Sequence, residues 1–134
     1  MHKILIVEDD VALFNLYKTQ LELSDYSVVH VADGSLAIQT IKSEQPALVL
    51  LDIMLPGRSG LEILQAIRED EEIKDTNVIM LTNFGNEENV STALELGAID
   101  YIMKYKIVPT ELVEKISSVL GGAETTSSIA VTNT

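Results

Sequence analysis

The sequence predicts an α/β fold, a five-stranded, doubly wound parallel sheet of strand order 2-1-3-4-5 with five helices on its two faces. Short apolar runs alternate with segments of helical spacing, and the connections between them are short. The third and fourth runs are nearly continuously apolar, as in parallel strands covered on both faces. The expected strands lie at about 3–7, 26–31, 47–52, 77–82 and 99–103.

The ends of the first three expected helices carry capping signals. Asp10 is expected to cap the first helix, and Asp33-Gly34 marks the turn into the second. Pro46 follows the second helix. Ser59 and Glu62 fit a capping box at the start of the third.

The last two helices are predicted from apolar spacing and from their first residues. Asn86, followed by two glutamates, suits the start of the fourth helix, whose Val90, Ala93 and Leu94 recur at helical spacing. Pro109 suits the first turn of the fifth helix, where its missing N–H costs little.

Length and composition indicate one globular domain with a tail. We expect residues 1–120 to form the domain, and 121–134, which lack periodicity, to be a disordered tail or the start of a linker. The chain has no cysteine, which excludes disulfides and thiolate metal sites. Its formal charge of -12 disfavours direct binding of nucleic acid. No signal peptide and no run of roughly 20 apolar residues is present, so we expect a cytoplasmic protein without membrane contact.

Polar residues stand where four of the apolar runs end. Glu8 and Asp9 follow the first, Asp52 ends the third, Thr82 the fourth, and Lys104 follows the fifth. Ligands of open parallel sheets bind outside the carboxyl ends of the strands, where the strand order reverses. In the predicted order this place lies between the first and third strands. Three carboxylates should therefore converge there.

Such a cluster needs compensation for its charge. Two carboxylates about 4 Å apart repel by roughly 4 kcal/mol at an effective dielectric constant of 20. A raised pKa, the ammonium of Lys104 or a divalent cation could offset the repulsion. Oxygen ligands alone favour a hard ion, and Mg²⁺ fits best. A cation and an ammonium beside a nucleophilic carboxylate suit phosphoryl transfer, with the Thr82 hydroxyl as a further donor to the phosphate oxygens.

Four segments, in this order and at these separations, match a family. They are Lys3–Asp10, Leu51–Gly60, Val78–Thr82 and Gly97–Lys104. Over residues 2–120 the chain resembles the receiver domain of two-component response regulators, which has a flavodoxin-like fold. The resemblance is compatible with a stand-alone, chemotaxis-type regulator and with an isolated receiver cut from a longer regulator.

The resemblance implies a role for each matching residue. Asp52 is similar to the phosphoacceptor and Lys104 to its counter-cation. Mg²⁺, or Mn²⁺, would be held by Glu8, Asp9, Asp52 and the backbone carbonyl of Met54. The protein would then catalyse only its own phosphorylation and dephosphorylation.

The resemblance also implies a switch and partners. Thr82 is similar to the switch hydroxyl and Tyr101 to the switch aromatic, although Tyr101 considered alone favours a core position. A sensor histidine kinase or a phosphotransfer protein would supply the phosphoryl group. Output would pass to a downstream protein partner through the surface of the fourth helix, fifth strand and fifth helix.

Two positions depart from the family pattern. Tyr105 follows Lys104 where the family usually has a cis-proline. A cis bond before another residue costs about 2.5–4 kcal/mol, so we predict a trans bond with Lys104 still reaching the site. Asn83 replaces a residue that is commonly small, and could modulate phosphorylation or dephosphorylation. Met54 and Phe84 also flank the site and could shield an acyl phosphate from water.

Other functions remain open at this stage. A degenerate receiver that signals by binding alone is favoured only by the missing proline. A flavin or small-molecule module would place a phosphate loop where Glu8-Asp9-Asp10 stands, and these acids repel phosphate. An aspartyl phosphatase would need a second aspartate at position 54, which is methionine. His2 and His30 have no partner pattern and receive no role.

Overall fold

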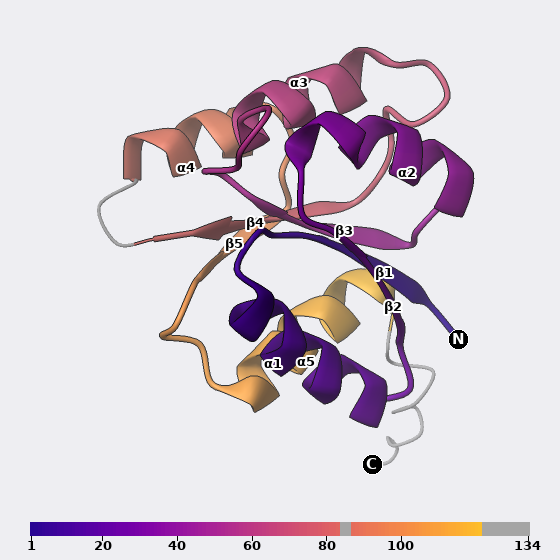
Figure 1. Cartoon of the computed structure of the whole chain (residues 1–134), viewed down its shortest axis with the longest axis vertical. Helices are drawn as coiled ribbons and strands as arrows, with labels where there is room; N and C mark the ends of the chain where they lie inside the picture. The colour runs from indigo at the N-terminus through magenta and orange to yellow at the C-terminus, as the bar shows by residue number, and fades with distance from the viewer. Residues whose placement is uncertain (84–86, 122–134) are drawn as a thin grey trace.

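The computed structural model describes residues 1–83 and 87–121, and in this part of the chain a five-stranded parallel sheet has the order β2-β1-β3-β4-β5 (Figure 1). The predicted fold class is therefore confirmed. The strands are β1 (Lys3–Val7), β2 (Ser27–Val31), β3 (Leu48–Asp52), β4 (Val78–Thr82) and β5 (Asp100–Met103). Each strand ends at its predicted residue, and all except β1 begin one residue later than predicted.

Two layers of helices cover the sheet. Helices α2, α3 and α4 lie on one face, and α1 and α5 lie on the other (Figure 1). The helices are α1 (Val11–Leu23), α2 (Ala37–Glu44), α3 (Gly60–Glu69), α4 (Glu87–Glu95) and α5 (Pro109–Leu120). A 3₁₀ turn, η1 (Gly34–Leu36), leads into α2.

The strands supply both cores because their side chains alternate between the faces. Leu5 and Val7 of β1 pack with the α2-α3-α4 layer, while Ile4 and Ile6 pack with the α1-α5 layer. β3 and β4 are buried along their whole length. Burial on both faces explains why these two segments lack the alternation of a half-exposed strand.

The predicted caps are present wherever the structure describes them. The Asp10 carboxylate accepts from the backbone N–H of Leu13, and Ser59 and Glu62 form the capping box of α3. Asp33 caps the 3₁₀ turn before α2. Pro109 is the first residue of α5. The prediction for Asn86 falls outside the described residues, as does that for the tail beyond residue 121.

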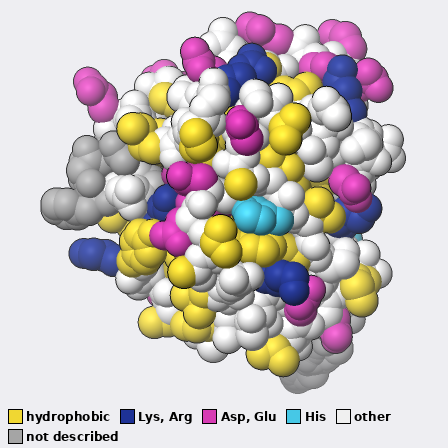
Figure 2. Space-filling view, viewed as in Figure 1, with side chains coloured by type: hydrophobic (Ala, Val, Ile, Leu, Met, Phe, Trp, Pro, Cys, Tyr) yellow, Lys and Arg dark blue, Asp and Glu magenta, His cyan; other side chains and the backbone are white. Residues whose placement is uncertain are grey.

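The surface reflects the excess of acidic over basic residues in the sequence. Acidic side chains gather toward the top of the face shown in Figure 2, where α2, α3 and α4 lie. Within residues 1–83 and 87–121, no helix combines the length and apolarity needed to cross a membrane.

Arg68 fastens three chain segments together. Its guanidinium donates to the carbonyls of Leu96 and Gly97 after α4, and to those of Lys74 and Thr76 before β4. These contacts join α3 to the turns that precede β4 and β5. They lie at the opposite ends of the strands from the polar residues that the sequence analysis singled out.

Gly60 sets how closely α3 approaches the end of β3. A Cβ atom there would lie 2.1 Å from the carbonyl oxygen of Asp52 and 2.8 Å from Cα of Ile53. The Gly60 N–H also donates to the Ile53 carbonyl over 2.8 Å. The backbone on both sides of Asp52 is therefore packed directly against the first turn of α3.

We predict that Gly60→Ala lowers the free energy of unfolding by about 1–3 kcal/mol, because the added methyl group must displace backbone atoms. Urea denaturation of the two proteins measures the difference. An unchanged midpoint and slope would contradict the close approach described here.

Candidate functional site

The parallel register brings the polar strand ends to one edge of the sheet. Val7 pairs with Leu51, Asp52 with Leu81 and Thr82 with Met103, so the residues at and just after these positions lie side by side. Four of them are buried polar or charged residues, and their side chains come from different strands. They are Glu8, Asp52, Thr82 and Lys104.

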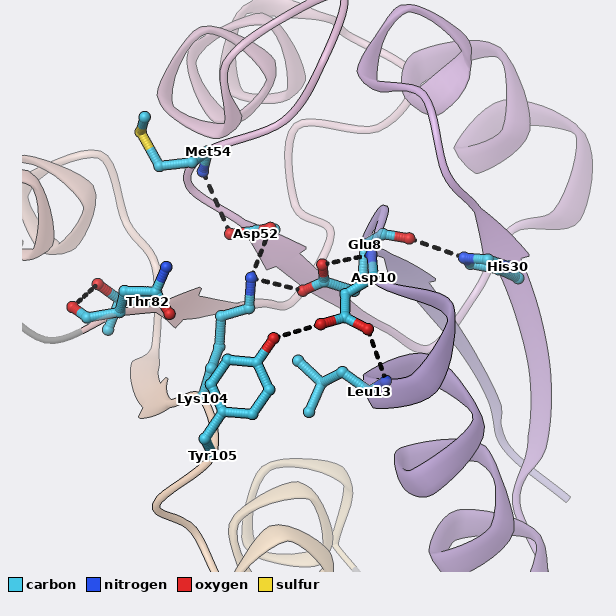
Figure 3. Close-up of polar contacts among 10 residues, drawn as sticks. Glu8, Asp10, Leu13, His30, Asp52, Met54, Thr82, Lys104 and Tyr105 are labelled. Carbon is cyan, nitrogen blue, oxygen red and sulfur yellow. Dashed lines mark hydrogen bonds and ion pairs between the residues drawn. The ribbon is translucent and has the colours of Figure 1, made fainter.

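Lys104 pairs with both buried carboxylates. Its Nζ lies 2.8 Å from Oδ2 of Asp52 and 2.9 Å from Oε1 of Glu8 (Figure 3). The other oxygen of each carboxylate accepts from a backbone N–H, Asp10 for Glu8 at 2.9 Å and Met54 for Asp52 at 3.2 Å. Glu8 is 0% exposed and Asp52 1% exposed. One ammonium is thus buried with two carboxylates.

The third carboxylate completes a set of oxygen ligands. Glu8, Asp9 and Asp52 each offer an oxygen atom, and these atoms lie within 4.8 Å of one another. Asp9 is exposed, so the set opens to solvent on one side. Three carboxylates beside one ammonium leave two formal negative charges. A small divalent cation with water completing its shell fits this donor set.

Burial changes the protonation equilibria of the cluster. Desolvation raises the pKa of Glu8 to about 7, although the Asp10 N–H and Lys104 oppose it. Desolvation likewise raises the pKa of Asp52 against the effect of Lys104. Burial alone would lower the pKa of Lys104, but its hydrogen bonds to Asp52 and Glu8 outweigh burial and raise it. Lys104 is therefore charged at neutral pH.

Thr82 is buried beside this cluster and borders a cavity. Its hydroxyl donates to the Asn83 carbonyl at 3.1 Å (Figure 3). The cavity has a volume of about 370 Å³, and its lining consists of Thr82, Asn83, Val90, Ser91, Leu94, Tyr101 and Met103. It lies between the end of β4, α4 and β5.

Tyr101 is on the surface and not in the core. Its side chain is 40% exposed and lines the cavity beside Thr82. The expectation from strand position alone was wrong. β5 is one of the two edge strands of the sheet and has a neighbouring strand on one side only. Met54 and Asn83 are exposed as well, and Phe84 lies outside the described residues.

The bond between Lys104 and Tyr105 is trans, as predicted. Tyr105 has a φ of +66°, a left-handed conformation that costs about 1–2 kcal/mol for a residue with a Cβ atom. Its hydroxyl donates to the carboxylate of Asp10 (Figure 3). Asp10, expected only to cap α1, thus also contacts the loop after β5.

His30 is a neighbour of the site that the sequence analysis did not single out. Its Nε2 lies 2.7 Å from the backbone oxygen of Glu8, and its ring stacks on Phe14 with centroids 3.7 Å apart. The His30 ring therefore supports the peptide that links Glu8 to Asp9. Its place at the end of the strand beside β1 was the only signal that could have indicated this contact.

We predict that the metal-free protein loses stability as pH rises from 4.5 to about 7, because the folded state binds a proton on Glu8 that the unfolded state has released. One pKa unit corresponds to about 1.4 kcal/mol, so the loss is on the order of 3 kcal/mol. Urea unfolding in a chelator across this range measures it. Glu8→Gln should flatten the slope, while Glu62→Gln at the exposed α3 capping box should keep it. Equal slopes in wild type and Glu8→Gln would refute the assignment.

Comparison with known proteins gives the family. The family model described as the response regulator receiver domain matches residues 4–117. A probable transcriptional regulator, ycf27, of Cyanophora paradoxa is 39% identical over 122 residues, which are 91% of this chain and 49% of that protein. The phosphate regulon transcriptional regulatory protein PhoB of Pseudomonas aeruginosa is 39% identical over 117 residues, which are 87% of this chain and 51% of that protein. The chain spans about half the length of these curated relatives.

Solved structures agree with this assignment. A putative response regulator from Chloroflexus aurantiacus superposes with a TM-score of 0.83 at 30% identity, covering 90% of this chain and 98% of that one. The BeF3-activated receiver domain of RstA from Klebsiella pneumoniae gives a TM-score of 0.81 at 36% identity, covering 88% of this chain and 97% of that one. With the family model matching most of its length, this chain belongs to the receiver domains of two-component response regulators.

Proposed function

We propose that this chain is a phosphorylation switch whose phosphoacceptor is Asp52. The observation that carries the proposal is the buried cluster in which Lys104 pairs with both Asp52 and Glu8, with Asp9 within ligand distance. The donor is the phosphohistidine of a sensor histidine kinase or of a phosphotransfer protein. The reaction depends on Mg²⁺ or Mn²⁺.

The residues of the cluster have separate tasks. A carboxylate oxygen of Asp52 attacks phosphorus, the new O–P bond forms as the N–P bond of the donor breaks, and the electron pair returns to the imidazole nitrogen. Glu8, Asp9, Asp52 and the carbonyl of Met54 would hold the cation, which would supply positive charge against the phosphoryl oxygens. Lys104 already lies 2.8 Å from Asp52 and supplies a second positive charge there. The chain acts only on its own acyl phosphate.

The cavity beside Thr82 supports a conformational response. Phosphorylation of Asp52 places acceptor oxygens within reach of the Thr82 hydroxyl, which now bonds to Asn83. Rotation of Thr82 toward the phosphoryl group changes the wall of the cavity of about 370 Å³ that also borders Tyr101. The exposed Tyr101 ring then moves inward. This movement alters the α4-β5-α5 surface, through which a downstream protein partner reads the state.

The residues around the acceptor set how long the acyl phosphate lasts. Asn83 and Met54 are exposed beside the site and would meet water or a donor approaching Asp52. We assign Asn83, Met54 and Phe84 a modulating role on phosphorylation and dephosphorylation. The formal charge of -12 disfavours direct nucleic-acid contact by this chain, although the relatives include proteins named transcriptional regulators.

We expect acetyl phosphate with Mg²⁺ to add one phosphoryl group to the protein, seen as a single adduct by intact mass. Asp52→Asn should abolish the adduct, because the nucleophile is lost. Asp25→Asn is the matched control, since Asp25 is exposed and has a left-handed backbone that asparagine also adopts. The adduct should also disappear when a chelator removes Mg²⁺. An adduct that survives Asp52→Asn would refute the acceptor, and no adduct despite Mg²⁺ binding would favour a receiver that acts by binding alone.

We further predict that phosphorylation moves residue 101 from solvent into the cavity. The chain contains no tryptophan, so Tyr101→Trp provides a single fluorescent reporter. Its emission should shift to shorter wavelength when acetyl phosphate and Mg²⁺ are added, because the ring leaves water. Adding Thr82→Ala should remove the shift while the phosphoryl adduct still forms. An unchanged spectrum in the phosphorylated Tyr101→Trp protein would contradict the switch.

A further inference from the structure

Tyr105 closes a ring of contacts around the buried lysine. Its hydroxyl donates to Oδ2 of Asp10, the Asp10 backbone N–H donates to Oε2 of Glu8, and Oε1 of Glu8 pairs with Lys104 Nζ (Figure 3). The peptide bond between Lys104 and Tyr105 completes the ring. The loop that carries the lysine is thus tied to the loop that carries two of the cation ligands.

The hydroxyl contact is what holds Tyr105 in place. The side chain is 65% exposed, so burial of its ring contributes little, and its left-handed backbone is unfavourable for tyrosine. Asp10, in contrast, is anchored independently, because its other oxygen caps α1 by accepting from Leu13 over 3.1 Å. Asp10 is therefore a fixed point to which the exposed side chain of Tyr105 binds.

We propose that Tyr105 is a positioning residue for Lys104, and that its hydrogen bond to Asp10 keeps the ammonium seated between Glu8 and Asp52. This hydrogen bond restricts the loop after Lys104. The ring of a proline would restrict the same loop if proline followed the lysine. This inference rests on the proposed function, since it assigns a task to Lys104 in phosphorylation of Asp52.

The arrangement has two opposite consequences. The ammonium of Lys104 and an incoming Mg²⁺ are attracted to the same carboxylates, Glu8 and Asp52, so a firmly seated lysine competes with the cation. The same position of Lys104 also places the ammonium next to the space that the phosphoryl oxygens will occupy, which favours the transfer step. Loosening Lys104 should therefore tighten Mg²⁺ binding and slow phosphorylation.

The test uses Tyr105→Phe, which removes only the hydroxyl. Calorimetry should show Mg²⁺ binding tightened about threefold, and the phosphorylation rate by acetyl phosphate at saturating Mg²⁺ should fall about fivefold, as for loss of one solvent-exposed hydrogen bond of ordinary net strength. Tyr26→Phe is the matched control, because its hydroxyl bonds to Ser117 at 2.8 Å in a structural contact with α5. It should leave both quantities unchanged. General loosening of the fold would lower both the Mg²⁺ affinity and the phosphorylation rate. A fall in both quantities, or no change in either, would therefore overturn the proposal.

A second variant checks the partner. Asp10→Ser keeps a capping oxygen for α1 but is too short to reach Tyr105. In that background Tyr105→Phe should have no further effect on the Mg²⁺ affinity or on the rate, because the contact is already absent. Additive effects of the two substitutions would show that Tyr105 acts through something other than Asp10.

A metal-free measurement separates this inference from the proposed function. The buried ammonium of Lys104 should give a slowly exchanging ¹⁵N NMR signal, assigned by its loss in Lys104→Arg. The signal should persist in Tyr26→Phe and exchange faster in Tyr105→Phe. If it is equally protected in both variants, the positioning role is wrong. If it responds as expected while the wild type forms no phosphoryl adduct, the proposed function fails and the contact stands.

Discussion

An excess of buried negative charge at the carboxyl edge of the sheet governs this molecule. Glu8 and Asp52 are both shielded from water and share one ammonium, that of Lys104. Removing one partner of such a cluster leaves an uncompensated buried charge, which is strongly destabilising. Burial raises the pKa of Glu8, so protonation of Glu8 is one way to relieve this excess, and binding of a divalent cation would be another. The same charge that costs stability is thus what makes the site chemically useful.

The surrounding structure holds this charge in a defined place. The parallel register aligns the ends of β1 and β3, and close approach at Gly60 packs the Asp52 backbone against α3. The His30 ring contacts the Glu8 carbonyl from β2. Few of these contacts bring stability through apolar burial. They set the direction of the carboxylates, which the proposed phosphoryl transfer requires.

Much of the fold could be predicted because its determinants are local. Apolar runs marked β3 and β4, and Ser59 with Glu62 marked the start of α3 through a contact between residues three apart. The cluster was predictable too, since polar residues at the ends of parallel strands meet at one edge. Tyr101 considered alone was misjudged because its exposure depends on the cavity that remains between β5 and α4, which no local pattern records.

The sequence by itself determined the order of the elements, the class of sheet and the candidate residues at its edge. These depend on periodicity and residue type, which are local properties of the sequence. Tertiary structure alone decided how those residues pair. Lys104 pairs with Glu8, although almost the whole sequence of the domain separates them. Tyr105 reaches Asp10 through a left-handed backbone conformation. Such contacts depend on the relative placement of loops after different strands. A small rotation in either loop would break them without changing any local pattern.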